Sequence, residues 1–106
     1  MYQIFNNPRK MLQKTFIKSK GAYKVKFTLK PENAETVELL GLNSDWETPV
    51  PLSKKKDGSF SIEIALPKDT KHEFKYRVNE TEWLIEEDAD AQEPNGLGST
   101  NSVLVL

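Results

Sequence analysis

Two tryptophans, Trp46 and Trp83, are the residues with the clearest potential for molecular recognition in this sequence. Trp46 stands in the polar segment 43–49, which reads Asn-Ser-Asp-Trp-Glu-Thr-Pro, and Trp83 follows a turn beside Glu82. An indole exposed on a loop presents a negative π face, on which the apolar C–H face of a pyranose ring can pack. Residue type alone also allows each indole to be a core residue, so both interpretations stay open at this point.

Sugar recognition also requires hydrogen-bonding groups beside the aromatic platform, because the rim of a pyranose carries hydroxyls. Lys75 alternates with Phe74 and Tyr76, and this alternation predicts that its ammonium points away from the core. Asn101 could both donate and accept hydrogen bonds. Taken alone, Lys75 would be interpreted as one of many solvated lysines.

The residues that usually perform catalysis are scarce in this chain. His72 is the only histidine, and we interpret it as an exposed residue at the start of a strand rather than as a base. There is no cysteine, no serine stands in a nucleophile-elbow context, and no glycine-rich loop follows a strand and opens a helix. We therefore expect a protein that is not an enzyme and uses no cofactor.

An acidic run extends along the chain from residue 86. Its carboxylates are Glu86, Glu87, Asp88, Asp90 and Glu93. Such groups could coordinate Ca²⁺, or supply an acid–base pair for glycoside hydrolysis. The run lacks the spacing of an EF-hand loop, and we predict a solvated loop over residues 86–98 with no metal site.

The composition is that of one ordinary domain. The chain has 106 residues, of which 37 % are hydrophobic and 29 % charged, and a formal net charge of -1. This balance gives no reason to expect a nucleic acid or a membrane as a partner. The absence of cysteine excludes disulfides and thiolate zinc sites. Residues 1–19 lack the apolar run of a signal peptide, so a cytoplasmic location is expected.

Apolar and polar residues alternate with a period of two along most of the chain, which is typical of half-buried strands. The predicted strands occupy residues 23–29, 36–42, 60–66, 74–78 and 103–106, with shorter ones near Leu52 and Trp83. The dipeptide Asp57-Gly58 predicts a hairpin turn before the strand at 60–66. An extended first strand is expected within residues 7–17.

These elements predict the fold class. No window shows a convincing helical period, and about seven to eight strands joined by Gly, Pro and Asn turns predict an all-β antiparallel sandwich. Residues 1–18 are expected to form an N-terminal extension or first strand, and residues 19–106 to form the domain.

Four motifs follow one another between residues 37 and 104. They are Val-Glu-Leu-Leu-Gly-Leu-Asn-Ser-Asp-Trp at 37–46, His-Glu-Phe-Lys-Tyr-Arg-Val at 72–78, Trp83, and Asn-Gly-Leu-Gly-Ser-Thr-Asn-Ser-Val-Leu at 95–104. In this order the chain resembles the family-48 carbohydrate-binding modules, which include the glycogen-binding domain of the AMP-activated protein kinase beta subunit. The resemblance implies an immunoglobulin-like, early-set β-sandwich.

The resemblance also implies a site for α-glucans such as glycogen, starch or maltooligosaccharides. Carried over position by position, the carbohydrate-binding residues are Trp46, Lys75, Trp83, Leu97, Ser99 and Asn101. The sequence departs from the family in three places: the turn before Trp83 is longer and lacks glycine, Glu86-Glu87-Asp88 stands where Asp-Pro is usual, and Leu42 stands where phenylalanine is common. The alternative is a protein-interaction or scaffold module of the same fold, which docks a glycogen-metabolising enzyme without binding sugar itself.

Overall fold

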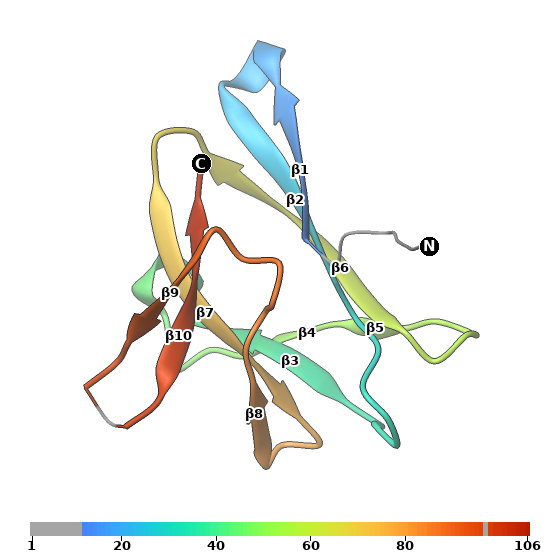
Figure 1. The fold of residues 1–106 in the computed structure, drawn as a ribbon. Coiled ribbons are helices and arrows are strands. Elements are labelled where there is room, and N and C mark those ends of the chain that lie inside the picture. Colours follow the sequence, from blue (N-terminus) through green and yellow to red (C-terminus); the bar gives the residue numbers. More distant parts are fainter. Residues whose placement is uncertain (1–11, 97) are drawn as a thin grey trace, which may run out of the picture.

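The computed structural model describes residues 12–96 and 98–106, and these residues form two antiparallel sheets. The strands are β1 (Leu12–Ile17), β2 (Ala22–Leu29), β3 (Val37–Leu40), β4 (Val50–Pro51), β5 (Ser53–Lys54), β6 (Phe60–Pro67), β7 (Lys71–Val78), β8 (Glu82–Leu84), β9 (Ala91–Pro94) and β10 (Thr100–Val105). Two 3₁₀ turns, η1 (Lys18–Lys20) and η2 (Leu42–Ser44), complete the described elements. Figure 1 shows β1, β2 and β6 side by side in one layer, and β7, β10 and β9 in the other. The immunoglobulin-like β-sandwich predicted from the sequence is confirmed.

The first sheet has the strand order β1-β2-β6-β5. The alternation that predicted β2 is reproduced, because Val25 and Phe27 are fully buried while Lys24 is exposed and Lys26 is half-buried. The predicted turn joins β5 to β6, and the Asp57 carboxylate caps it by accepting bonds from the N–H and the hydroxyl of Ser59. These local bonds fix the register in which β5 pairs with β6.

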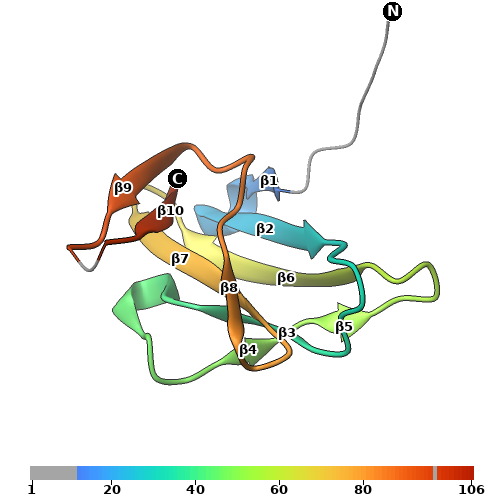
Figure 2. The same ribbon diagram turned by 60° about the horizontal axis from the view of Figure 1, so that its bottom comes forward.

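The second sheet is centred on β7. β3 pairs with one edge of β7, while β10 and β8 share the other edge one after the other. The full strand order is β4-β3-β7-β10-β9, with β8 beside β7. The segment between β8 and β9 crosses the molecule past β10, as Figures 1 and 2 show. This connection brings residues that are distant in sequence onto one face of the sheet.

The core lies between the two sheets and is built around aromatic rings. Phe74 packs edge-on against Phe27 of the facing sheet, with ring centroids 5.4 Å apart, and against Tyr76 at 5.9 Å. All three rings are fully buried, and edge-to-face packing of this kind adds to the free energy gained from burial. Leu39 and Leu104 fill the same layer. The site described below therefore rests on a well-packed central strand.

Two details differ from the sequence-based expectation. The described residues form ten strands rather than the seven or eight that the sequence predicted. The difference comes from very short strands, since β4, β5 and β8 are only two or three residues long. The prediction of a loop over residues 86–98 is wrong for residues 91–94, because these residues form β9 and pair with β10. The residues of β9, Ala-Gln-Glu-Pro, have low strand propensity, and it is the neighbouring edge of β10 that imposes the extended conformation.

Of the predicted first strand, Leu12–Ile17 forms β1, and the earlier residues lie outside the described part of the chain.

Within residues 12–96 and 98–106, no helix is long and apolar enough to cross a membrane.

Candidate functional site

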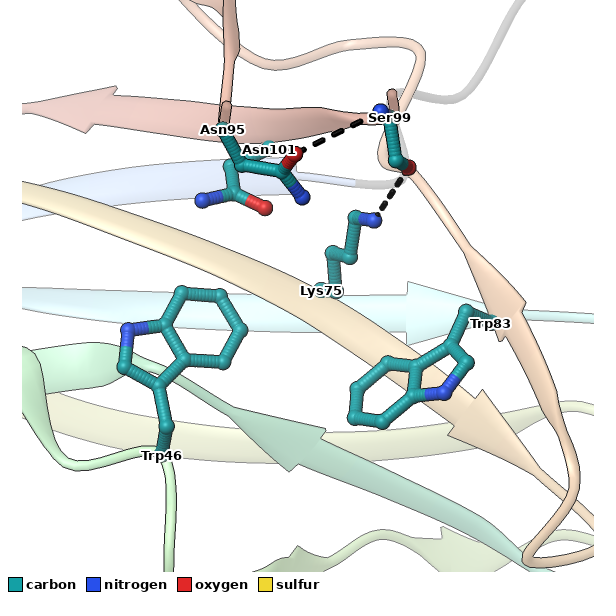
Figure 3. Close-up of a pocket in the computed structure, with 6 residues that line it drawn as sticks. All are labelled: Trp46, Lys75, Trp83, Asn95, Ser99 and Asn101. Carbon is teal, nitrogen blue, oxygen red and sulfur yellow. Dashed lines mark hydrogen bonds between the residues drawn. The ribbon is translucent and has the colours of Figure 1, made fainter. Parts of the chain in front are cut away.

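A pocket of about 400 Å³ opens on the outer face of the six-stranded sheet. Its lining residues are Trp46, Lys75, Trp83, Asn95, Ser99 and Asn101. Figure 3 shows the two indoles on opposite sides of Lys75, with Ser99 and the two asparagines above it. Trp46 is 39 % exposed and Trp83 is 47 % exposed, so neither ring belongs to the core. The question that the sequence left open for both tryptophans is thereby decided.

The strands place these side chains on one face by their pairing register. Leu40 of β3 lies opposite Lys75 of β7, and Val103 of β10 lies opposite Glu73. Because successive side chains of a strand point to opposite faces, Leu40 and Val103 point outward like Lys75. Both are nevertheless buried and lie outside the main core cluster. The outer face of the sheet thus carries buried apolar residues of its own, next to Lys75 and Glu73.

The position of Trp46 depends on a glycine. Gly41 has φ of 108°, a conformation that glycine adopts without strain, and begins the turn that leads to Trp46. A Cβ atom at this position would lie 2.7 Å from Cζ2 of Trp46 and 2.5 Å from the carbonyl oxygen of Glu73. The indole therefore packs directly on the bare Cα of Gly41, and any side chain there would displace it.

Asp45 rigidifies the same loop from the other side of Trp46. Its Oδ1 atom accepts hydrogen bonds from the backbone N–H groups of Glu47 and Thr48, both at 3.0 Å. These bonds stabilise the charged form, and they lower the pKa of the Asp45 carboxyl below its ordinary value. An aspartate that holds its own loop in this way supports a fixed orientation of the tryptophan that follows it.

Trp83 lies at the end of a row of residues across three strands. Glu38 of β3 pairs with Arg77 of β7, and Arg77 pairs with Trp83 of β8. Oε1 of Glu38 accepts a hydrogen bond of 3.0 Å from Nε of Arg77 and lies 2.9 Å from Nη2 in the ion pair between the two side chains. The guanidinium carbon of Arg77 lies 5.6 Å from the Trp83 ring centroid, within the range of a cation–π contact. No sequence motif indicated this contact.

Lys75 supplies the positive group between the two indoles. Lys75 points to the outer face of the sheet, as the alternation predicted. It is nevertheless only 8 % exposed, because the other residues of the pocket surround it. The Nζ atom donates a hydrogen bond of 2.6 Å to Oγ of Ser99. An ammonium carries three N–H donors. Within the described residues, Ser99 is the one hydrogen-bond partner of this group, so two donors remain for acceptors in the pocket.

Asn101 and Asn95 complete the polar rim of the pocket. Nδ2 of Asn101 donates to Oε1 of Glu73 at 3.0 Å, which fixes an amide that is 8 % exposed. Oδ1 of Asn95 accepts from the backbone N–H of Ser99 at 3.3 Å, and the backbone N–H of Asn95 donates to the Ser99 carbonyl at 3.0 Å. These bonds close the loop that presents Ser99 to Lys75, as Figure 3 shows.

The structure brings together Trp46, Lys75, Trp83, Ser99 and Asn101 from the predicted set, and Leu97 lies outside the described residues. The sequence-based argument missed one lining residue, Asn95. The available signal was its Asn95-Gly96 dipeptide, which predicts a tight turn and therefore a loop that closes on itself.

The prediction that His72 is an exposed strand residue is wrong, because the side chain is buried with 6 % exposure. Its Nδ1 atom accepts a hydrogen bond of 3.1 Å from the N–H of Asn43, and Nε2 lies 3.0 Å from Oγ1 of Thr70. The physical reason is parity: His72 shares the inward side of β7 with Phe74 and Tyr76. The same alternation that placed Phe74 in the core could have placed His72 there.

The acidic run is also not simply a solvated loop. Glu86 is 3 % exposed, its Oε1 accepts a 2.6 Å hydrogen bond from the Tyr76 hydroxyl, and its Oε2 accepts one from the N–H of Asp88. Burial raises the pKa of Glu86 above its ordinary value. Asp90 accepts two bonds of 2.7 Å from Lys14. These carboxylates hold the connection between β8 and β9 to the sandwich.

No group of three or more His, Cys, Asp or Glu side chains in the part of the chain that the structure describes is arranged to hold a metal ion.

Comparison with solved structures identifies the fold. A ferric enterobactin esterase from Salmonella typhimurium matches 92 % of this chain with a TM-score of 0.72 and 11 % identity. A pullulanase from Bacillus acidopullulyticus matches 99 % with a TM-score of 0.61 and 17 % identity, and the catalytic module of a glycogen-degrading pneumococcal virulence factor matches 93 % with a TM-score of 0.58 and 14 % identity. The chain covers 34 %, 14 % and 17 % of these three proteins.

Comparison with curated protein sequences gives no match. A family model, described as the glycogen recognition site of AMP-activated protein kinase, matches residues 23–106, which include every residue that lines the pocket. The resemblance found in the sequence motifs is thereby confirmed. The chain belongs to the family of glycogen recognition domains, a group of carbohydrate-binding modules.

Proposed function

We propose that this protein binds α-glucan chains, such as glycogen, starch or maltooligosaccharides, at the pocket between Trp46 and Trp83. The observation that carries the proposal is the arrangement of two partly exposed indoles on opposite sides of the Lys75 ammonium. Membership of the glycogen recognition family supports the choice of ligand. Of the proteins that share the fold, one is named a pullulanase and another is described as glycogen-degrading.

The chemistry of the pocket suits a neutral polyol. Each indole can pack against the C–H face of one glucose unit, and such an aromatic contact contributes roughly 1 kcal/mol. Lys75 has donors for hydroxyl oxygens, while the amide of Asn101 and the hydroxyl of Ser99 can both donate and accept. The affinity of so open a site is expected to be modest, since two stacked rings are its main source of binding free energy.

We further propose that the domain is not catalytic. His72, the only histidine, is buried and occupied by bonds to Asn43 and Thr70. The buried carboxyl of Glu86 is bonded to Tyr76, and neither group lines the pocket. We expect no release of reducing ends when the pure protein is incubated with glycogen, and a time-dependent release would contradict this part of the proposal.

A titration with β-cyclodextrin and maltoheptaose, followed by calorimetry and by NMR, tests the binding proposal. We expect saturable binding that is lost in Trp46→Ala and in Trp83→Ala. Phe16→Ala is the matched control, because Phe16 has the same 47 % exposure as Trp83 but lies on β1 in the other sheet. Its affinity should equal that of the wild type.

Two results would reject the proposal. One is the absence of any shift at millimolar sugar, and the other is binding that survives both tryptophan substitutions. If the folded protein binds no sugar, the same surface would be better interpreted as a protein-docking face, which is the alternative that the sequence left open.

A further inference from the structure

We propose that Glu38 and Arg77 are positioning residues for glucan binding, which act by holding the Trp83 ring in place. The proposal rests on the proposed function of the pocket and assigns a task to two residues that do not line it. Arg77 sits beside Trp83, and Glu38 sits beside Arg77, in one row across β3, β7 and β8.

Trp83 needs such support because its strand is weakly held. β8 has three residues, and among the described strands it pairs with β7 alone. The turn that leads into β8 has positive φ at Asn79 and Glu80 and is closed by a bond of 3.1 Å from the N–H of Thr81 to the carbonyl of Val78. It sets the register of the hairpin backbone but does not fix the rotamer of the Trp83 side chain. A large ring that is 47 % exposed on a short edge strand would otherwise sample several rotamers.

The Arg77 guanidinium can supply this support because it is itself fixed. Its Nε donates a hydrogen bond to Oε1 of Glu38, and its Nη2 lies 2.9 Å from the same oxygen in an ion pair. The side chains of Arg77 and Glu38 are 26 % and 19 % exposed. A planar guanidinium stacks on an aromatic face, whereas a lysine ammonium lacks that geometry. Since Arg77 does not line the pocket, it supports the indole from outside and leaves the ring's pocket-facing surface free for a ligand.

The consequence for binding depends on the length of the glucan. A ligand long enough to reach both tryptophans uses the fixed Trp83 ring, while a short ligand seated at Trp46 does not. Loss of Arg77 should therefore weaken maltoheptaose binding more than maltotriose binding. A general loss of structure would weaken both to the same extent.

The first measurement follows the ring itself. Trp46→Phe leaves Trp83 as the sole tryptophan, because the chain contains two. In this background, Arg77→Gln and Glu38→Gln should increase acrylamide quenching of the Trp83 fluorescence and lower its anisotropy, while Arg77→Lys should give intermediate values. Lys71→Gln is the control, because Lys71 lies on the same strand as Arg77 but forms its ion pair with Glu93 of β9. This substitution should change neither quantity.

The second measurement follows affinity in the chain with both tryptophans. Arg77→Gln should raise the dissociation constant for maltoheptaose by about twofold to fivefold, the range expected of one cation–π contact, and leave that for maltotriose nearly unchanged. Arg77→Lys should recover part of the loss, and Lys71→Gln should match the wild type. Thermal unfolding of each variant checks that the fold is retained.

Unchanged quenching in Arg77→Gln, or equal losses for maltotriose and maltoheptaose, would overturn the positioning proposal. The fluorescence measurement needs no ligand. A wild-type protein that binds no glucan would therefore reject the proposed function, while the behaviour of the Trp83 ring would still decide whether Glu38 and Arg77 position it.

Discussion

The Nδ1 atom of His72 accepts a hydrogen bond of 3.1 Å from the backbone N–H of Asn43, which joins the central strand to the turn that carries Trp46. Nε2 of the neutral ring can then donate to Thr70, whose hydroxyl donates to the carbonyl of Pro67 at 2.7 Å. Each donor in this chain of bonds meets one acceptor. The arrangement requires the neutral ring, because a protonated Nδ1 would face the N–H of Asn43 with no lone pair.

This relationship predicts a pH dependence of stability. Burial lowers the pKa of His72 below its ordinary value of 6.5, so the unfolded chain takes up a proton more readily than the folded protein. The contribution of His72 is fully present above the unfolded pKa and decreases as the pH falls below it. We expect the free energy of unfolding in urea to decrease between about pH 7 and about pH 5, and to decrease less in His72→Asn, whose Oδ1 can accept the same bond without titrating. Equal slopes in the two proteins would contradict the assignment.

Gly41→Ala should damage both stability and binding. The new Cβ would meet the Glu73 carbonyl oxygen at 2.5 Å and Trp46 at 2.7 Å, in a backbone conformation with φ of 108°. We expect a loss of about 1–3 kcal/mol in the free energy of unfolding. Displacement of the indole should also weaken maltoheptaose binding by about fivefold.

Gly58→Ala is the matched control for this substitution. Gly58 also has a positive φ, of 90°, but the nearest atom to its added Cβ is Cε of Lys30 at 3.9 Å. It should lose stability without losing affinity. A Gly41→Ala protein that binds maltoheptaose like the wild type would show that Trp46 does not depend on this packing.

Tyr76→Phe should destabilise the sandwich through Glu86. The Tyr76 hydroxyl donates a 2.6 Å bond to a carboxyl that is 3 % exposed, and its removal leaves that oxygen with one partner fewer. The expected loss is about 1–3 kcal/mol in the free energy of unfolding. Urea unfolding at constant pH measures it.

Glu86→Gln provides the companion measurement. The single amide oxygen can accept from the Tyr76 hydroxyl or from the Asp88 N–H but not from both, so we expect a loss similar to that in Tyr76→Phe. Because the folded pKa of Glu86 is raised by burial, its carboxyl favours folding at low pH, and this contribution is lost as the pH rises through the folded pKa. Glu86→Gln should abolish that part of the pH dependence, and an unaltered profile would show that Glu86 does not titrate as a buried group.

Lys75→Met should weaken glucan binding while preserving the fold. The substitution keeps an unbranched stem over the sheet and removes the ammonium that donates to Ser99. Hydrogen bonds from a charged donor are strong, so the dissociation constant for maltoheptaose should rise by about tenfold. Calorimetric titration gives the constant, and near-ultraviolet circular dichroism reports the fold.

A salt titration separates a glucan from a charged partner. Because glucose units carry no charge, the wild-type affinity should stay nearly constant between about 0.05 and about 0.5 M NaCl. A steep decrease with salt would contradict a site built for a neutral polymer.

The sequence by itself determined the sandwich and the identity of most pocket residues. Strict alternation, as in Phe74-Lys75-Tyr76, fixes which side chains face the core, because the side chains of a strand repeat every two residues. The order of the motifs then indicated Trp46, Lys75, Trp83 and Asn101. The first inference depends on local pattern alone, while the second depends on the resemblance to a known family, and neither required the coordinates.

Only the tertiary structure decided which of these groups is held in place and by what. Whether Trp46 is exposed depends on the bare Cα of Gly41, and the support of Trp83 depends on Arg77 and Glu38, which come from two other strands. The buried carboxyl of Glu86 likewise has as its partner a hydroxyl ten residues away in the chain, that of Tyr76. Contacts between strands depend on register and on crossing connections, and these are set by the packing of the whole sandwich rather than by any one segment.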